Sequence, residues 1–256
     1  MSPTIQFGAI VAVCALLWIV ESIVPLFNYR GKRVRHALPN FGLTIVLFAM
    51  NIAFSFASVF AAAYALRNHI GALFLVDWPW PVEAVLAIAG LDLFTYFAHA
   101  SMHKSRIGWR FHRVHHCDTQ VDVTTAYRQH PGETIFRIAW QLAGIVAFGV
   151  PLWVLAVYLT LSSVNALFEH ANVRVPERLD AILRLCFVTP NMHKWHHSRI
   201  QAETDSNYSN ILSVWDRLFG TYTGKTGYTD IEYGLNGLDG EVSRSMSKLL
   251  QLPFVR

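Results

Sequence analysis

The chain has 256 residues, of which 53% are hydrophobic and only 15% are charged, and its formal net charge is +4. Charged residues make up about 25% of an ordinary soluble domain, so this composition predicts an integral-membrane protein instead. In a membrane protein a positive charge indicates topology rather than nucleic-acid binding. The three scattered cysteines suggest neither a disulfide framework nor a Cys-x-x-Cys metal pair.

Two membrane helices are predicted in the first third of the chain. The apolar run from Ile5 to Phe27 has no basic residue before it and no small-residue cleavage site, so we interpret it as a retained helix and not as a signal peptide. Residues 41–66 contain no charged side chain, and about 20 apolar residues suffice to cross a bilayer as a helix. Between the two runs lies a basic loop that contains Arg30, Lys32, Arg33 and Arg35.

Three further apolar helices are predicted. One begins near Val82 and continues past Met102. After a polar, basic stretch, residues 135–168 form an apolar segment that Gly149 and Pro151 interrupt, which predicts a hairpin of two helices. The fold class is therefore all-α: an integral-membrane bundle of five transmembrane helices, or of four if the hairpin is shallow.

The basic residues predict the orientation, because lysine and arginine collect on the cytoplasmic side. Residues 30–35 and 104–113 are both basic and are separated by two helices, so both are expected on that side. The hairpin returns the chain there, which makes the C-terminal region a cytoplasmic, histidine-rich helical cap. We expect one membrane domain over residues 1–256, with N-terminal transmembrane helices at 1–81, a core at 82–225 and a tail at 226–256.

Ten of the twelve histidines fall into a pattern. Two of them are four residues apart at the end of the third predicted helix, which places both rings on one helical face. Two copies of His-x-x-His-His follow, and two single histidines lie near the predicted cytoplasmic boundary. The first box is His99 and His103, the second is His112, His115 and His116, the third is His193, His196 and His197, and the single residues are His130 and His170.

This pattern predicts a site for two metal ions. Imidazole suits iron, zinc, copper and nickel, and histidine in a membrane helix is costly and usually functional. One ion takes about four to six ligands, so eight to ten histidines on one side of the membrane supply two ions. The isolated His36 and His69 are interpreted as ordinary polar residues.

Further residues accompany the boxes in a recognisable order. They are Asp92-x-x-x-Tyr96 before His99, Trp109 before His112, Arg128-Gln-His130-Pro131-x-Glu133, Phe168-Glu-His170-Ala-Asn172, Pro190 before His193, Asp205-x-Asn207-Tyr208 and Trp215-Asp-Arg217-Leu-Phe219-Gly220-Thr221. In order and spacing this set resembles the fatty acid hydroxylase / sterol desaturase superfamily of membrane di-iron oxygenases. The resemblance covers about residues 82–225. One departure is Ala100, where the family often has arginine.

The resemblance implies a membrane-bound, non-haem oxidoreductase that uses molecular oxygen as co-substrate. Two iron ions would be held by the eight boxed histidines together with His170 and His130, and a purified sample could carry zinc instead. The substrate would be a fatty acyl chain, a sterol or a related membrane lipid. No Gly-x-Gly-x-x-Gly fingerprint is present, so electrons would come from a separate donor of the ferredoxin or cytochrome type with its reductase. No nucleic-acid partner is expected, and the oligomeric state stays open.

Five polar residues near the boxes are candidates to support the ligands. An unpaired carboxylate in an apolar helix is costly, so Asp92 is expected to accept a hydrogen bond from a ligand histidine or an arginine, or else to pair with another polar helix residue. Arg128 and Glu133 are expected either to orient His130 or to form a surface pair. The full set is Asp92, Arg128, Glu133, Asn172 and Asp205.

Several functions share these features. A hydroxylase and a desaturase use the same boxes and differ in the fate of the substrate after one hydrogen atom is removed. A dizinc membrane hydrolase is less well matched, because such sites usually include carboxylate ligands. A metal carrier is also disfavoured, since its polar residues would lie along a path through the membrane, whereas these histidines gather at one face. Hydroxylation is the leading hypothesis, with desaturation as the alternative.

Overall fold

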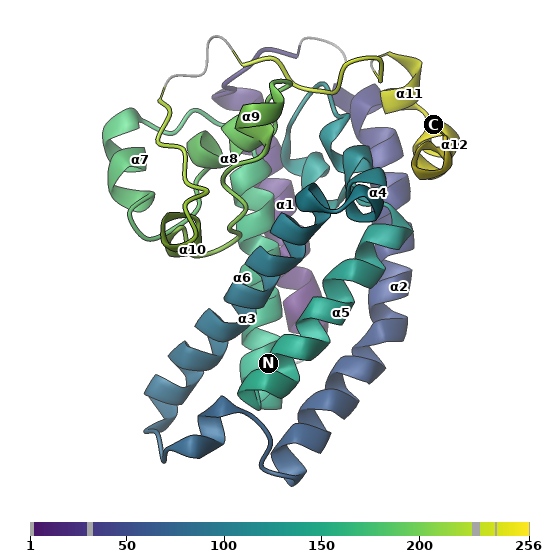
Figure 1. Ribbon diagram of the computed structural model, residues 1–256. Coiled ribbons are helices and arrows are strands. Elements are labelled where there is room, and N and C mark those ends of the chain that lie inside the picture. Colours follow the sequence, from purple (N-terminus) through teal and green to yellow (C-terminus); the bar gives the residue numbers. More distant parts are fainter. Residues whose placement is uncertain (1–2, 30–32, 227–230, 239, 256) are drawn as a thin grey trace.

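The computed structural model describes residues 3–29, 33–226, 231–238 and 240–255. Within these ranges the regular structure is helical, and β pairing is limited to three isolated bridges. Long helices form an elongated bundle, and short helices gather at one end of it as a cap (Figure 1). The predicted all-α fold is therefore confirmed.

Five long helices make up the bundle. The second begins at Arg33 rather than near residue 41, so Arg33 and Arg35 belong to a helix and not to the predicted loop; Arg30 and Lys32 lie outside the described residues. The helices are α1 (Pro3–Ile23), α2 (Arg33–Arg67), α3 (Trp80–Lys104), α5 (Pro131–Phe148) and α6 (Leu152–His170).

Among the described residues, four helical segments are long and apolar enough to cross a membrane: Thr4–Ile23, Arg33–Leu75, Trp80–Lys104 and Leu152–His170. Large apolar side chains on their outer faces are exposed, as for Phe56 at 75% and Phe60 at 72%. A surface of this kind suits lipid and not water. The protein is a membrane protein, and the four segments correspond to the lower of the two predicted numbers. The remaining long helix, α5, packs against α2 and α3.

The predicted hairpin is present between α5 and α6. Gly149 ends α5 in the left-handed conformation, with φ of 73°, and a Cβ atom there would lie 2.5 Å from the carbonyl oxygen of Ile70. Glycine is the residue that tolerates both conditions. Pro151 then precedes the first turn of α6, where its missing N–H group is harmless. The hairpin brings the end of α6 back to the cap (Figure 1).

The second histidine box lies on a short, capped helix, and the third lies on and directly after another. The Ser105 hydroxyl accepts a hydrogen bond from the Gly108 amide at the start of α4, and Thr189 does the same for Met192 at the start of α8. The short helices are α4 (Arg106–His116), α7 (Glu177–Leu183), α8 (Pro190–His196), α9 (Gln201–Thr204), α10 (Val214–Leu218), α11 (Glu241–Arg244) and α12 (Met246–Gln251), with 3-10 turns η1 (Ala72–Leu75), η2 (Val123–Tyr127) and η3 (Leu252–Phe254).

Glu21 near the end of α1 ties the bundle to the cap. One of its carboxylate oxygens accepts hydrogen bonds from the backbone amides of Val123 (2.7 Å) and Asn172 (2.6 Å), and the other pairs with Arg33 at 2.7 Å. The Asn172 side chain in turn bonds to both backbone groups of Phe27. These contacts fix the segment after His170, the last residue of α6, against the segment after α1.

Candidate metal centre

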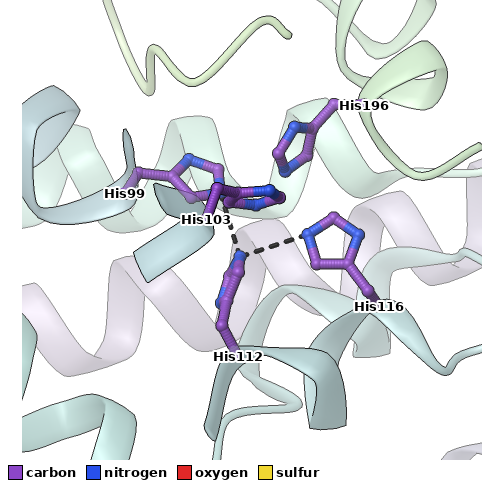
Figure 2. A group of neighbouring side chains, drawn as sticks. All are labelled: His99, His103, His112, His116 and His196. Atoms are coloured by element: carbon purple, nitrogen blue, oxygen red, sulfur yellow. Dashed lines mark hydrogen bonds between the residues drawn. The ribbon is translucent and has the colours of Figure 1, made fainter. Parts of the chain in front are cut away.

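Five histidines form a first group. Their ligand nitrogens all lie within 4.8 Å of one another, and Figure 2 shows the rings pointing toward a shared space. The Nε2 atom of His112 lies 3.1 Å from Nε2 of both His99 and His116. The group combines His99 and His103 of α3, His112 and His116 of α4, and His196 of α8.

Four other histidines form a second group by the same measure. The Nε2 atom of His170 is central: it lies 3.1 Å from Nε2 of His115 and of His193 and 3.2 Å from that of His197. The last two of these nitrogens are themselves 3.2 Å apart. Helices α4, α6 and α8, which are distant in sequence, thus converge on one point.

The spacing of these nitrogens fits ligands and not a hydrogen-bonded cluster. A neutral ring nitrogen carries either one hydrogen or one lone pair, so the three mutually close Nε2 atoms of His170, His193 and His197 cannot all bond to one another. Two ligands at about 2.1 Å from one ion, at right angles, would be about 3 Å apart. In the first group, Nε2 of His103 and of His196 is buried without a hydrogen-bond partner. The residues therefore fit two metal ions.

The outward ring nitrogens are held by acceptors. Three Nδ1–H groups donate to backbone carbonyls, which fixes the tautomer and leaves Nε2 as the free ligand atom. This is the arrangement that ligating histidines usually show. The pairs are His99 with Tyr208 O (2.8 Å), His170 with Ala166 O (2.7 Å) and His196 with Ser206 O (2.7 Å).

Two carboxylates contact outward nitrogens of the first group. Glu133 Oε1 lies 3.1 Å from Nδ1 of His112, and Asp205 Oδ1 lies 3.2 Å from Nδ1 of His103. A carboxylate in this position raises the basicity of its ring and holds its orientation. The sequence pattern predicts that Glu133 orients His130, whereas the structure places its carboxylate beside His112.

Burial keeps the cap histidines neutral. Burial first, and the neighbouring histidines second, lower the pKa values of His115, His116, His193 and His197 well below the usual range. Burial likewise lowers the pKa of His196 to about 3. Neutral imidazole is the form that binds metal, so the site is prepared for ions without a cost of deprotonation.

A family model described as fatty acid hydroxylase matches residues 84–221, which include every histidine of both groups. The chain belongs to the fatty acid hydroxylase family. As a member of this family it is an oxidoreductase, and the resemblance inferred from its boxes is confirmed.

Relatives of this family member are named as hydroxylases and monooxygenases. An ornithine lipid hydroxylase of Rhizobium tropici is 31% identical over 255 aligned residues, which cover 94% of this chain and 73% of the relative. An alkylglycerol monooxygenase of Xenopus tropicalis is 28% identical over 81% of this chain, and a methylsterol monooxygenase 1 of Danio rerio is 27% identical over 56%. The chain spans 45% and 48% of the length of these two relatives. No solved structure matches the chain.

His130 lies outside both groups of histidines. Its Nδ1 accepts a hydrogen bond from the Gly132 amide at 2.9 Å, and its Nε2 lies 3.1 Å from the carbonyl oxygen of Leu250. Both ring nitrogens are therefore engaged, one of them as the N-cap of α5. The structure thus places His130 outside both groups, which contain the other nine predicted histidines.

Two of the predicted supporting residues have other contacts than expected. Asp92 accepts from the amides of Ile211 (3.1 Å) and Leu212 (2.9 Å) and from the Trp215 indole (2.9 Å), so it holds the C-terminal loop and neither a histidine nor an arginine. Arg128 is fully buried and bonds not to His130 but to groups on α2, α4 and α11. Its partners are Asn40 Oδ1, Val114 O, Cys117 Sγ and Ser243 O.

Asn172 also has a different role, since it braces the segment after α1 rather than a ligand side chain. His36, which the sequence excluded from the site, lies outside both groups and contacts Asp118 (2.7 Å) and Asp122 (3.2 Å).

Sequence reasoning missed Glu169. It is buried at the end of α6, and its Oε1 lies 3.7 Å from Nδ1 of His170 and 3.9 Å from Nε2 of His193. The available signal was a carboxylate in an apolar helix directly before a predicted ligand.

Proposed function

We propose that this protein is a di-iron hydroxylase that inserts one oxygen atom from molecular oxygen into an unactivated C–H bond of a membrane lipid. The observation that carries the proposal is the pair of converging imidazole groups at the cap end of long apolar helices. The names of the relatives support hydroxylation over desaturation, because each describes a hydroxylase or a monooxygenase. Desaturation of a lipid by the same site is the alternative.

Nine histidines of this chain would hold the two iron ions, five in the first group and four in the second. Bound iron would supply the redox chemistry that activates oxygen and removes a hydrogen atom from the lipid. The chain's own contribution is to present neutral Nε2 atoms, to fix the ring orientations through carbonyl and carboxylate acceptors, and to keep water away from the site by burial. Zinc binds the same ligands and would give an inactive protein.

The first lipid to test is a polar lipid with acyl chains. The ornithine lipid hydroxylase aligns along 94% of this chain. The proposal is supported by a groove of about 1130 Å³ between α1 and α2, which is lined mainly by apolar residues such as Phe7, Ile45 and Phe48. Several membrane crossings, a cytoplasmic cap and a separate electron donor complete the proposal.

The decisive experiment uses the full-length, iron-loaded protein in nanodiscs that contain the candidate lipid, with a chemical reductant and ¹⁸O₂. The product is analysed by mass spectrometry. Hydroxylation predicts a gain of one ¹⁸O atom, whereas desaturation predicts a loss of two hydrogens. Turnover under strict anaerobiosis, or incorporation of oxygen only from labelled water, would overturn the oxygenase assignment and support the dizinc hydrolase.

A further inference from the structure

A backbone carbonyl that orients a histidine of the first group is itself held from behind. The carbonyl oxygen of Tyr208 accepts a hydrogen bond from Nδ1 of His99 at 2.8 Å, and it belongs to the peptide group that joins Tyr208 to Ser209. We propose that Asp216 is a positioning residue of the first metal site, which acts on His99 through this peptide group. The inference rests on the proposed function only in that the first group binds a metal ion.

The carboxylate of Asp216, in the middle of α10, grips this peptide group. The residue is fully buried. Its Oδ2 accepts from the Ser209 amide at 3.0 Å, and its Oδ1 accepts from the Tyr208 amide and the Thr221 hydroxyl, both at 2.7 Å. The N–H and C=O of a trans peptide group point in opposite directions, so the Ser209 N–H lies on the side away from His99. Carboxylate, peptide group and imidazole therefore form one chain of hydrogen bonds that ends at the ligand atom Nε2.

Such a chain carries part of the negative charge of Asp216 toward the metal site. Hydrogen bonds in a buried chain polarise one another, so a charged acceptor on the Ser209 N–H makes the Tyr208 carbonyl a stronger acceptor. A stronger bond to Nδ1 holds the ring of His99 in place and raises the basicity of its Nε2. Carboxylates contact the outward nitrogens of two other first-group histidines directly, whereas Asp216 reaches His99 through one peptide group.

The neighbouring peptide group repeats the arrangement for a second ligand. The Ser206 carbonyl accepts from Nδ1 of His196 at 2.7 Å, and the Asn207 N–H of the same peptide group donates to the Thr221 carbonyl at 2.9 Å. Asn207, between the two peptide groups, has a left-handed φ of 52°, which asparagine tolerates better than most residues. The Thr221 hydroxyl donates to Asp216, so one buried carboxylate stands behind the loop that orients two ligands.

Asp92 provides a matched comparison on the same C-terminal loop. It is a fully buried carboxylate that accepts from two consecutive amides, those of Ile211 and Leu212. The carbonyl of the peptide group that joins these residues accepts from the Val188 amide at 2.9 Å and not from a histidine. Asp92 and Asp216 thus make the same kind of contact with the loop, but only the chain from Asp216 ends at a metal ligand.

The test uses the purified full-length protein in nanodiscs, freed of metal and titrated with Co²⁺ alone. Asp216→Asn keeps the size of the side chain and removes its charge, so the Kd of one ion should rise about 10-fold. The Co²⁺ absorption bands that change should be those that His103→Ala, which removes a first-group ligand, also changes. Asp92→Asn should lower the melting temperature by a similar amount and should bind both ions with the native Kd values.

Three results would overturn the inference: native Kd values in Asp216→Asn, changes confined to the bands of the second ion, or equal rises in Kd in the two Asn variants. If Asp216→Asn does not fold, a cryo-EM structure of the native zinc-loaded protein decides instead. Distances of at most about 3.2 Å from His99 Nδ1 to Tyr208 O and from Ser209 N to Asp216 support the chain, and a different partner for either group refutes it.

Neither readout uses oxygen or lipid, so the two proposals can fail separately. A loaded protein that shows the expected Kd changes but does not hydroxylate lipid would refute only the proposed function. A protein that hydroxylates lipid, and whose Asp216→Asn variant binds both ions with native Kd values, would refute only this inference.

Discussion

His115 and His116 are adjacent in the chain, but their rings face different metal groups and are inclined at 88° to each other. The cause is helical geometry. Residues on an α-helix are about 100° apart, so His116 lies about 40° to one side of His112 and His115 about 60° to the other. The first and last histidines of the box therefore go together. The third box repeats the rule with the groups exchanged, since His193 and His197 join the second group and His196 the first.

This alternation predicts which double variants lose one ion and which lose two. His112→Ala with His116→Ala removes two ligands of the first group, so about one ion per chain should remain. His115→Ala with His116→Ala removes one ligand from each group, so both ions should bind more weakly, by about 10-fold or more each. Metal content after mild chelation, measured by mass spectrometry of the purified proteins, distinguishes the two patterns. Identical losses in the two double variants would contradict the alternation.

His130 should affect stability and not metal content. His130→Ala removes the N-cap of α5 and should lower the free energy of unfolding by about 1 kcal/mol, while both ions stay bound. His130→Asn restores a good N-cap and should recover much of the loss. His170→Ala serves as the comparison, because it removes the central ligand of the second group and should lower the metal content. Loss of an ion from His130→Ala would restore this residue to the ligand set.

Acid should destabilise the metal-free protein. Burial places the pKa of His196 at about 3 and lowers the pKa values of four other cap histidines, whereas an unfolded histidine titrates near a pH of about 6.5. Below that pH the unfolded state binds more protons, so the free energy of unfolding falls as the pH falls toward about 3. Bound zinc should oppose the effect until protons displace it. Thermal unfolding of both forms at several pH values measures this, and a flat profile for the metal-free form would be inconsistent with neutral buried rings.

A native cysteine can locate the cap. Cys186 is exposed on the cap, while Cys117 is buried and Cys14 is half-buried in α1. If the cap is cytoplasmic, a membrane-impermeant maleimide should label the protein in inside-out vesicles and not in intact spheroplasts. Cys186→Ser should abolish the labelling. Labelling of intact spheroplasts would place the cap on the outer side.

Local patterns in the chain predict most of the helices and most of the histidines that meet. Apolar runs mark α1, α3, α5 and α6, and the offset of three and four within each box marks a shared helical face. The apolar run does not mark the start of α2, because the first turn of this helix is basic and its Arg33 pairs with Glu21, twelve positions earlier in the chain.

Long-range partners account for the other errors. Asp92 bonds to amides more than one hundred residues further along the chain, and a single carboxylate in a helix gives no sign of such a partner. His130 belongs to the motif Arg128-Gln-His130-Pro131-x-Glu133. Its contact with the Leu250 carbonyl, however, depends on where the C-terminal segment packs. Sequence spacing thus indicates which ligands can share a helix, and tertiary contacts decide which single residues join them.

Glu21 lies well before residue 84, where the match to the family begins, and yet it accepts hydrogen bonds from two amides inside the matched region, those of Val123 and Asn172. The matched segment consequently depends on a residue outside it for two of its backbone hydrogen bonds. A chimera that joins it to the first helices of another relative would leave both amides without an acceptor unless the donor of those helices supplies one in the same place. The sequence of the first helix is therefore constrained by the matched region, because that helix must supply an acceptor for the amides of Val123 and Asn172.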